Sequence, residues 1–102
     1  MSRALERLRK STTIGNLWMY IVKILLDSGP LKAYDIRRKL IETYGLKPAT
    51  VTVYSVIYRM TREGLLRKTS EPETRYEVTS KGIKYLEEAV LLLKELIEKL
   101  SH

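Results

Sequence analysis

Residues 52–86 read TVYSVIYRMTREGLLRKTSEPETRYEVTSKGIKYL. This stretch decides the predicted fold because it opens with an apolar helical pattern. Four apolar residues recur at the i, i+3, i+4, i+7 spacing of one helix face, namely Val53, Val56, Ile57 and Met60. Gly64 follows, and glycine commonly ends a helix. The first third of the stretch therefore predicts an amphipathic helix that stops at Gly64.

Two short strand-like runs come next, at residues 65–69 and 74–79. They flank residues 70–73, a polar turn that contains a proline. A helix, a hairpin and a further helix in this order are typical of a winged helix, in which the hairpin is the wing. In the second strand we expect Tyr76 and Val78 to pack, because they alternate with Arg75 and Glu77, which we expect to face water.

Three motifs resemble the PadR family of winged-helix transcriptional regulators. Residues 52–66 follow T-V-Y-x-x-x-x-R-M-x-R-E-G-L-L and residues 76–82 read Y-E-V-T-S-K-G, against the family's T-L-Y-x-x-L-x-R-L-x-x-x-G-L-I and Y-x-L-T-x-K-G. Residues 29–36, G-P-L-K-A-Y-D-I, are similar to the family's G-P-L-H-G-Y-E-I. The resemblance spans roughly residues 21–90 and implies a dimeric DNA-binding regulator, with Tyr34 and Tyr54 as its two characteristic tyrosines.

The chain departs from the family pattern at two places. Lys32 and Ala33 stand where the family usually has His-Gly, and residues 47–50 read K-P-A-T where it often has S-P-G-T. The second difference lies at the start of the helix that follows residue 50. In a winged helix-turn-helix this is the recognition helix, the one that enters the DNA groove.

The charge of the chain favours an anionic partner. Its 102 residues suffice for one domain with a modest core, and its net charge is +7. Residues 1–12 carry four basic residues and one acidic, and residues 45–69 carry five and one, whereas residues 80–102 carry four of each. Basic charge thus gathers in the segments that face DNA in a winged helix.

Several classes of protein are excluded by what the sequence lacks. There is no cysteine, so neither disulfides nor thiolate chemistry are expected, which suits a cytoplasmic protein. The apolar run at residues 17–26 contains Lys23 and is too short to span a membrane, and residues 1–13 do not resemble a signal peptide. The single histidine is His102, and paired acids, glycine-rich phosphate loops and metal-ligand clusters are absent. We expect no enzyme activity, no cofactor and no metal.

Upstream of residue 52 the pattern is helical. Residues 3–10 form a short amphipathic patch, a helix or a basic arm, and Thr12 or Thr13 is a candidate cap for the next helix. That helix carries a wide apolar stripe of Leu17, Trp18, Ile21, Ile24 and Leu25 and ends near residues 27–30. Another helix is expected over residues 32–44, with Ile36 and Leu40 inward, Arg37, Arg38 and Lys39 mostly outward, and Gly45 at its end.

The outward arc of the helix after residue 50 holds Val51, Thr52, Ser55, Tyr58, Arg59 and Arg62. We expect the hydroxyls near its start, those of Thr50, Thr52 and Ser55, to bond to base edges in the major groove. We expect Arg59 and Arg62, further along, to bind phosphates. On the wing, basic side chains suit a backbone or minor groove. The candidate DNA-binding residues are Lys47, Thr50, Thr52, Tyr54, Ser55, Arg59, Arg62, Arg67, Lys68 and Arg75. The alternative is that these residues are ordinary solvent-exposed residues of an amphipathic helix and bind no DNA.

The last helix has apolar residues separated by 3, 4, 3, 4 and 3 positions, a heptad seam with β-branched residues and leucines in alternate places. Thr79 or Ser80 can cap its start, and Leu91, Leu92 and Leu96 widen its face. We expect dimerisation against the first helix of the partner; packing back on its own head is the alternative. The candidate dimerisation residues are Leu17, Trp18, Ile21, Ile83, Leu86, Val90, Leu93, Ile97 and Leu100. Trp18 either packs in the core or stacks on a small-molecule effector at the dimer interface.

The sequence thus predicts a mainly α (α+β) chain, with a winged helix-turn-helix DNA-binding domain over residues 1–79 and a dimerisation helix over residues 80–102. The function expected is a homodimeric, sequence-specific regulator of double-stranded DNA, a repressor on a pseudo-palindromic operator. One alternative is an architectural chromatin protein that coats DNA without reading it. The other is a module that binds an acidic protein.

Overall fold

The computed structural model describes residues 2–69 and 72–101. The elements follow one another as α1 (Arg3–Ser11), η1 (Ile14–Asn16), α2 (Leu17–Ser28), α3 (Ala33–Tyr44), α4 (Thr50–Arg62), β1 (Leu66–Thr69), β2 (Arg75–Val78) and α5 (Ser80–Ser101). The succession of α4, an antiparallel hairpin and α5 confirms the mainly helical winged-helix fold that residues 52–86 predict. Part of the predicted turn, Ser70 and Glu71, lies outside the described residues.

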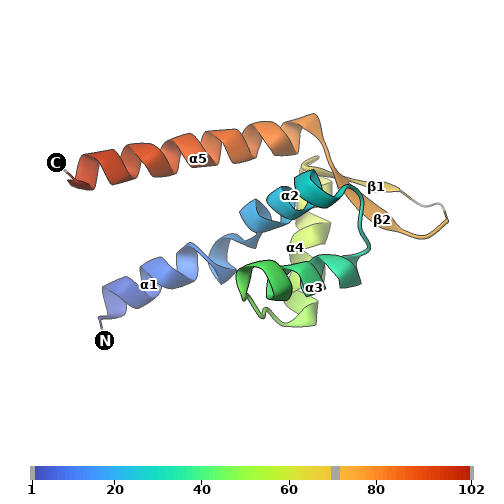
Figure 1. Cartoon of the computed structure of the whole chain (residues 1–102), viewed down its shortest axis with the longest axis horizontal. Helices are drawn as coiled ribbons and strands as arrows, with labels where there is room; N and C mark the ends of the chain where they lie inside the picture. Colours follow the sequence, from blue (N-terminus) through green and yellow to red (C-terminus); the bar gives the residue numbers. More distant parts are fainter. Residues whose placement is uncertain (1, 70–71, 102) are drawn as a thin grey trace.

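Helices α2, α3 and α4 pack with the wing into one body, here called the head (Figure 1). Helices α1 and α5 leave the head in the direction opposite to the wing, so both ends of the chain lie at the same end of the molecule (Figure 1). The extents of 51 × 28 × 22 Å reflect these two projecting helices.

The core lies between the three helices of the head and the start of the wing. Helix α4 contributes Val53, Ile57 and Met60, all buried, while Val56 packs against the core and is half-buried. Its inward face is therefore the one that the apolar spacing predicts. The remaining buried apolar residues come from α2, α3 and the segment after α4, namely Leu17, Ile21, Val22, Ile24, Leu25, Ile36, Leu40, Leu65 and Leu66.

The predicted helix ends are confirmed at two glycines. Gly45 (φ 67°) follows α3 and donates its N–H to Ile41, and Gly64 (φ 83°) follows α4. Both lie in the left-handed region, which glycine adopts without the steric cost that a Cβ brings.

The expected cap of α2 was wrong. The hydroxyls of Thr12 and Thr13 both donate back to the carbonyl of Arg9, at 3.2 and 2.7 Å, so these residues close α1 rather than start α2. The residue before α2 is Asn16, which makes no capping bond through its side chain. A threonine hydroxyl can serve either neighbouring helix, and here the carbonyls at the end of α1 are within its reach.

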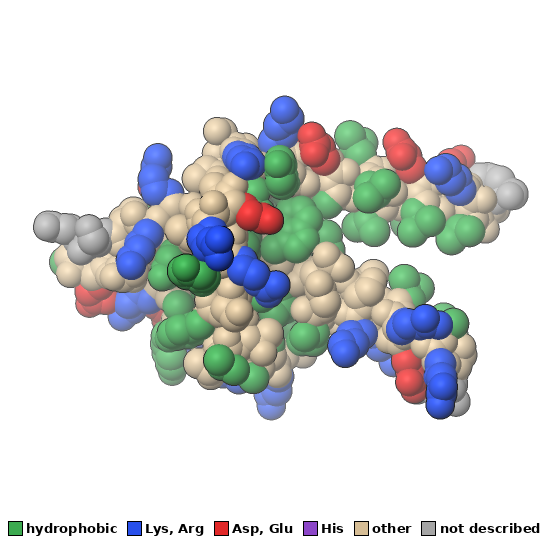
Figure 2. All heavy atoms as spheres, turned by 180° about the vertical axis from the view of Figure 1, so that it is seen from behind, with side chains coloured by type: hydrophobic (Ala, Val, Ile, Leu, Met, Phe, Trp, Pro, Cys, Tyr) green, Lys and Arg blue, Asp and Glu red, His purple; other side chains and the backbone are tan. Residues whose placement is uncertain are grey.

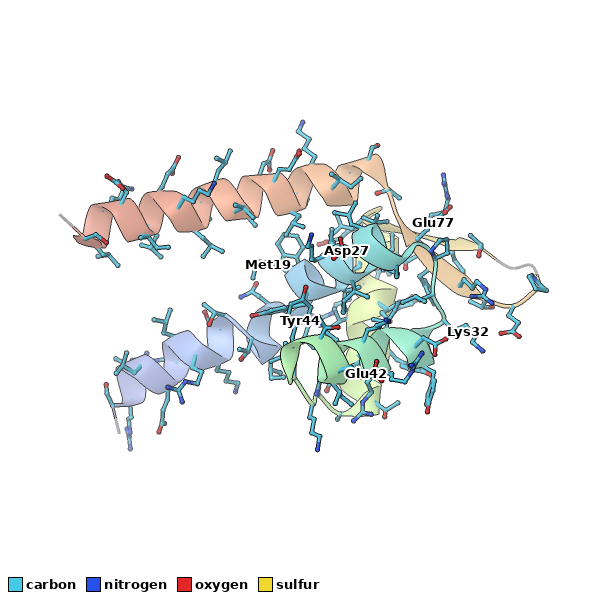
Figure 3. The ribbon with its side chains drawn as sticks, in the orientation of Figure 1. Met19, Asp27, Lys32, Glu42, Tyr44 and Glu77 are labelled. Carbon is cyan, nitrogen blue, oxygen red and sulfur yellow. The ribbon has the colours of Figure 1, made fainter. Side chains whose placement is uncertain are left out.

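The wing is attached to the segment before α3 through β2 and the turn that precedes β2. The backbone of Leu31 exchanges two hydrogen bonds with Tyr76, at 3.1 and 2.8 Å, and Lys32 Nζ lies 3.0 Å from Glu73 Oε2. Figure 3 shows Lys32 near the wing, at the start of α3. Tyr76 packs against the core, as expected. Arg75 is half-buried rather than open to water, because the strand lies against the head.

Candidate nucleic-acid interface

Helix α4 presents a mixed polar, aromatic and basic face on the side away from the core. At about 100° per residue, the positions opposite Val53 are Val51, Ser55, Tyr58 and Arg62. All four side chains are exposed, with exposed fractions of 76% for Val51 and 63% for Tyr58. This face is the central surface of the candidate interface.

Thr52 and Arg59 lie on one flank of that face. They help to line a cavity of about 540 Å³ whose other walls include Ile14, Trp18 and Tyr85. The side chain of Thr52 is half-buried there. This corrects the expectation that Thr52 shares the outward arc of the helix, since its position is about 90° from the centre of the face formed by Val51, Ser55, Tyr58 and Arg62.

The start of α4 is held by an arginine of α3. Arg37 Nε donates to the carbonyl of Pro48 at 2.9 Å, and Arg37 is half-buried rather than mostly outward. Ala49 precedes the helix and has no side-chain acceptor for its first turn. Lys47 and Thr50 are exposed beside this start. The sequence did not indicate the role of Arg37, because the contact joins segments that local patterns do not connect.

The two basic residues of β1 differ in their surroundings. The guanidinium of Arg67 is paired with Glu77 across the hairpin, at 2.7 and 2.8 Å, which also leaves Glu77 half-buried instead of facing water. Lys68 is exposed and lines a cavity of about 240 Å³ together with Tyr54 and Tyr76. The structure thus brings Lys68 and Tyr54 together between α4 and the wing.

Tyr58 is a residue of this surface that was not among the candidate DNA-binding residues. Its ring lies under the guanidinium of Arg62, 5.6 Å from centroid to carbon, a cation–π contact. Tyr34, at the start of α3, is 70% exposed. The helical wheel alone places Tyr58 on the outward arc, so the signal was present in the sequence.

Arg38 belongs to a separate cluster on α3. It pairs with Asp35 at 3.0 Å and with Glu42 at 3.6 Å, and Figure 3 marks Glu42 on this helix. The hydrogen bond with Asp35, followed by the charge of Glu42, raises the pKa of Arg38. Its positive charge is matched within α3 itself.

The candidate dimerisation residues need a correction on α2. Leu17 and Ile21 are 1% and 0% exposed inside the head, so neither has surface left for a partner. Trp18 is half-buried and its Nε1 donates to Asn16 Oδ1 at 3.3 Å. The apolar stripe of α2 is wide because the head surrounds it.

Helix α5 is covered only near its start. Leu86 packs against the core, whereas Val90, Leu93, Ile97 and Leu100 are exposed. Figure 2 shows hydrophobic side chains along the side of α5 that faces α1, and charged ones along its other side. On α1, Leu5 and Leu8 are exposed as well.

Three further leucines were expected to widen the seam of α5. At about 100° per residue, Leu92 and Leu96 extend its apolar side, but Leu91 falls among the charged residues. Leu91 is 59% exposed. It therefore does not widen the seam, and this corrects the expectation for that residue.

Two absences concern residues 2–69 and 72–101 alone. Within them, acidic side chains form no group of three that could hold a metal ion. No helix in the same ranges has the length and apolar character needed to cross a membrane.

Comparisons with known proteins give structural matches. Neither the family models nor the curated proteins match the sequence. A PadR-like transcription factor from Bacteroides fragilis has 28% identity and a TM-score of 0.68, over 99% of this chain and 98% of its own. A PadR-family regulator from Eggerthella lenta has 21% identity and a TM-score of 0.71, over 98% and 95%.

A winged-helix DNA-binding protein from STIV has 23% identity and a TM-score of 0.70, over 80% of this chain and 90% of its own. These matches confirm the winged-helix fold and the PadR-like resemblance that the motifs indicate. Regulators and DNA-binding proteins of this kind are not enzymes, which supports the expectation that this chain is not one.

Proposed function

Because this chain is a PadR-like winged-helix protein, we propose that it is a homodimeric, sequence-specific DNA-binding transcriptional regulator. It represses by occupying a pseudo-palindromic operator in the cytoplasm. The observation that carries the proposal is the exposed face of α4, where Val51, Ser55, Tyr58 and Arg62 lie on the side away from the core, with the exposed Lys68 on the neighbouring wing. Exposed apolar and aromatic side chains beside Arg62 and Lys68 suit a binding surface for an anionic partner better than plain exposure to solvent.

Within this face the residues divide by chemistry. A serine hydroxyl can bond to base edges and a valine can contact a thymine methyl, so Ser55 and Val51 read sequence in the major groove. Arg62 and Lys68 hold phosphates on either side. The uncapped start of α4, with Thr50 and Lys47 beside it, suits a further phosphate.

The dimer forms through the exposed apolar sides of α1 and α5. These sides contain Leu5 and Leu8 on α1 and the seam from Val90 onward on α5. Helix α1 carries four basic residues and one acidic, whereas residues 87–101 carry four acidic and two basic. Opposite charges favour α1 of one protomer against α5 of its partner, in addition to apolar burial.

Selection of bound duplexes from a random pool tests the sequence-specific function. We expect two related half-sites whose centres lie one or two helical turns apart, about 34 Å or a multiple of it. Binding should be at least on the order of 10³ tighter than to unrelated duplex. Equal affinity for every duplex would contradict the proposal and support an architectural role. An absence of duplex binding would leave an acidic protein as the partner.

An effector is the second part of the proposal. The cavity of about 540 Å³ beside Trp18 has apolar and aromatic walls and includes Thr52 and Arg59 of α4. A flat apolar molecule bound there would contact the recognition helix directly. Trp18 is the one tryptophan of the chain, so its fluorescence reports occupancy. Titration with flat aromatic compounds should quench it and change DNA affinity; quenching without that change would contradict a regulatory role.

A further inference from the structure

The T-S-K-G segment, residues 79–82, holds the first turn of α5 against the end of α4. The backbone N–H of Thr79 donates to the carbonyl of Leu65 at 3.1 Å. Its Oγ1 lies 2.6 Å from the carbonyl oxygen of Gly64 and accepts the N–H of Gly82 at 3.1 Å. One residue therefore caps α5 and ties it to the turn that follows α4.

Lys81 and Gly82 complete the contact. Lys81 Nζ donates to the carbonyl of Glu63 at 2.7 Å, and Glu63 is the C-cap residue that follows α4. A cation at this end also interacts favourably with the helix dipole. Gly82 is buried, and a Cβ there would lie 2.4 Å from Leu65 O and 2.8 Å from Val78 Cγ2. No larger residue fits without moving α5.

We infer that this joint, residues 63–65 with residues 79–82, sets the distance between the two recognition helices of the dimer and hence the spacing of DNA half-sites. The inference rests on the proposed function. The carbonyls of Glu63, Gly64 and Leu65 each accept a hydrogen bond from the T-S-K-G segment. Because hydrogen bonds are directional, these three bonds fix the direction in which α5 leaves the head. Packing of Leu86 against the core also stabilises the contact, but apolar packing is not directional and does not fix the orientation of α5.

The length of α5 makes the joint sensitive. Its 22 residues span about 33 Å. A tilt of about 10° at the joint moves the far end by about 6 Å, which corresponds to about two base-pair steps. Because the dimer forms along the far part of α5, such a tilt changes where the second head meets the DNA.

Thr79→Val tests the joint, with Thr79→Ser as the matched control that keeps the hydroxyl. Each variant is titrated against duplexes carrying two half-sites at the best spacing and at two base pairs more or fewer. The wild type should prefer its best spacing on the order of tenfold, and Thr79→Val should reduce this preference to about threefold or less. Affinity for a single half-site should not change. A Thr79→Val protein with the wild-type spacing preference would overturn the inference.

A second measurement needs no DNA. The chain has no cysteine, so Lys47→Cys introduces a unique site for a spin label at the start of α4. The label-to-label distance in the dimer should be narrowly distributed in the wild type and shifted or broadened by several ångströms in Thr79→Val and Gly82→Ala. Where Gly82→Ala fails to fold, Lys81→Met is measured in its place. An unchanged distribution would overturn the inference.

The two proposals fail differently. If the label-to-label distance shifts or broadens in the variants as expected but the wild type binds no duplex, the proposed function is wrong while the role of the joint in orienting α5 stands. If the wild type binds a palindrome but binds equally well at every half-site spacing, the joint does not set the half-site spacing. A wild type that is monomeric in sedimentation would overturn both.

Discussion

Helices α2 and α5 are both apolar along one side, but only α2 is covered within this chain. Ile21 and Leu25 of α2 are buried, whereas Ile97 and Leu100 of α5 are 63% and 78% exposed. Helix α2 lies inside the head, while α5 is longer than the head can cover (Figure 1). The same kind of apolar pattern therefore marks a side that the chain covers in α2 and a side that it leaves exposed in α5.

The largest effect should come from deleting a side chain that is covered within the chain. Ile21→Ala should lower the free energy of unfolding by about 2–5 kcal/mol, because it leaves a cavity in the core. Leu96→Ala on α5 is the matched control and should change it by less than about 0.5 kcal/mol at a concentration where the dimer has dissociated. Urea denaturation measures both. Equal losses would mean that α5 is covered by its own head after all.

The second effect tests the proposed dimer interface along α5. Ile97→Asp should raise the dissociation constant of the dimer on the order of 100-fold, since it buries an unpaired carboxylate. Leu91→Asp is the control, because Leu91 lies on the charged side of the same helix. Sedimentation over a range of concentrations separates the two variants. Dissociation by Leu91→Asp to the same extent would place the interface on both sides of α5.

The parts of the fold that local patterns control were predictable. The inward face of α4 follows from the spacing of Val53, Ile57 and Met60, and the helix ends follow from Gly45 and Gly64. These features depend on residues within one or two turns of each other, so neighbouring positions in the sequence contain the information.

Contacts between distant segments were not predictable in the same way. The bond from Arg37 to Pro48 and the pair of Arg67 with Glu77 join segments whose distance in space depends on the assembled head. The assignment of Leu17 and Ile21 to the dimer failed for a related reason, since periodicity shows that they are covered but not by which helix. Which of the residues on the exposed face of α4 and the wing contact bases, and which contact phosphates, stays a prediction.

The third effect compares two hydroxyls of α4. Ser55 is exposed, whereas Thr52 is half-buried beside the cavity at Trp18. Ser55→Ala should change which base is preferred at one position, at a cost of about 1–3 kcal/mol for the original sequence. Thr52→Ala should leave the preferred sequence unchanged. Selection from a random pool with each variant gives the answer, and a new preference in Thr52→Ala alone would reverse the assignment.

The smallest effect separates the two basic residues of β1. Lys68 is exposed and the proposed dimer has two copies of it, so Lys68→Ala should lower the slope of log K against log salt by about 0.9 for each phosphate that is no longer neutralised. Arg67 is already paired with Glu77 at 2.7 Å. The charge that it offers to a phosphate is partly matched, and Arg67→Ala should lower the slope less. Titration of one operator duplex between about 50 and 200 mM salt measures both slopes. If Arg67→Ala gave the larger reduction in slope, the ion pair of Arg67 with Glu77 would have to open when DNA binds. Glu77→Gln should then increase DNA affinity at low salt, because no ion pair would have to be broken to release Arg67.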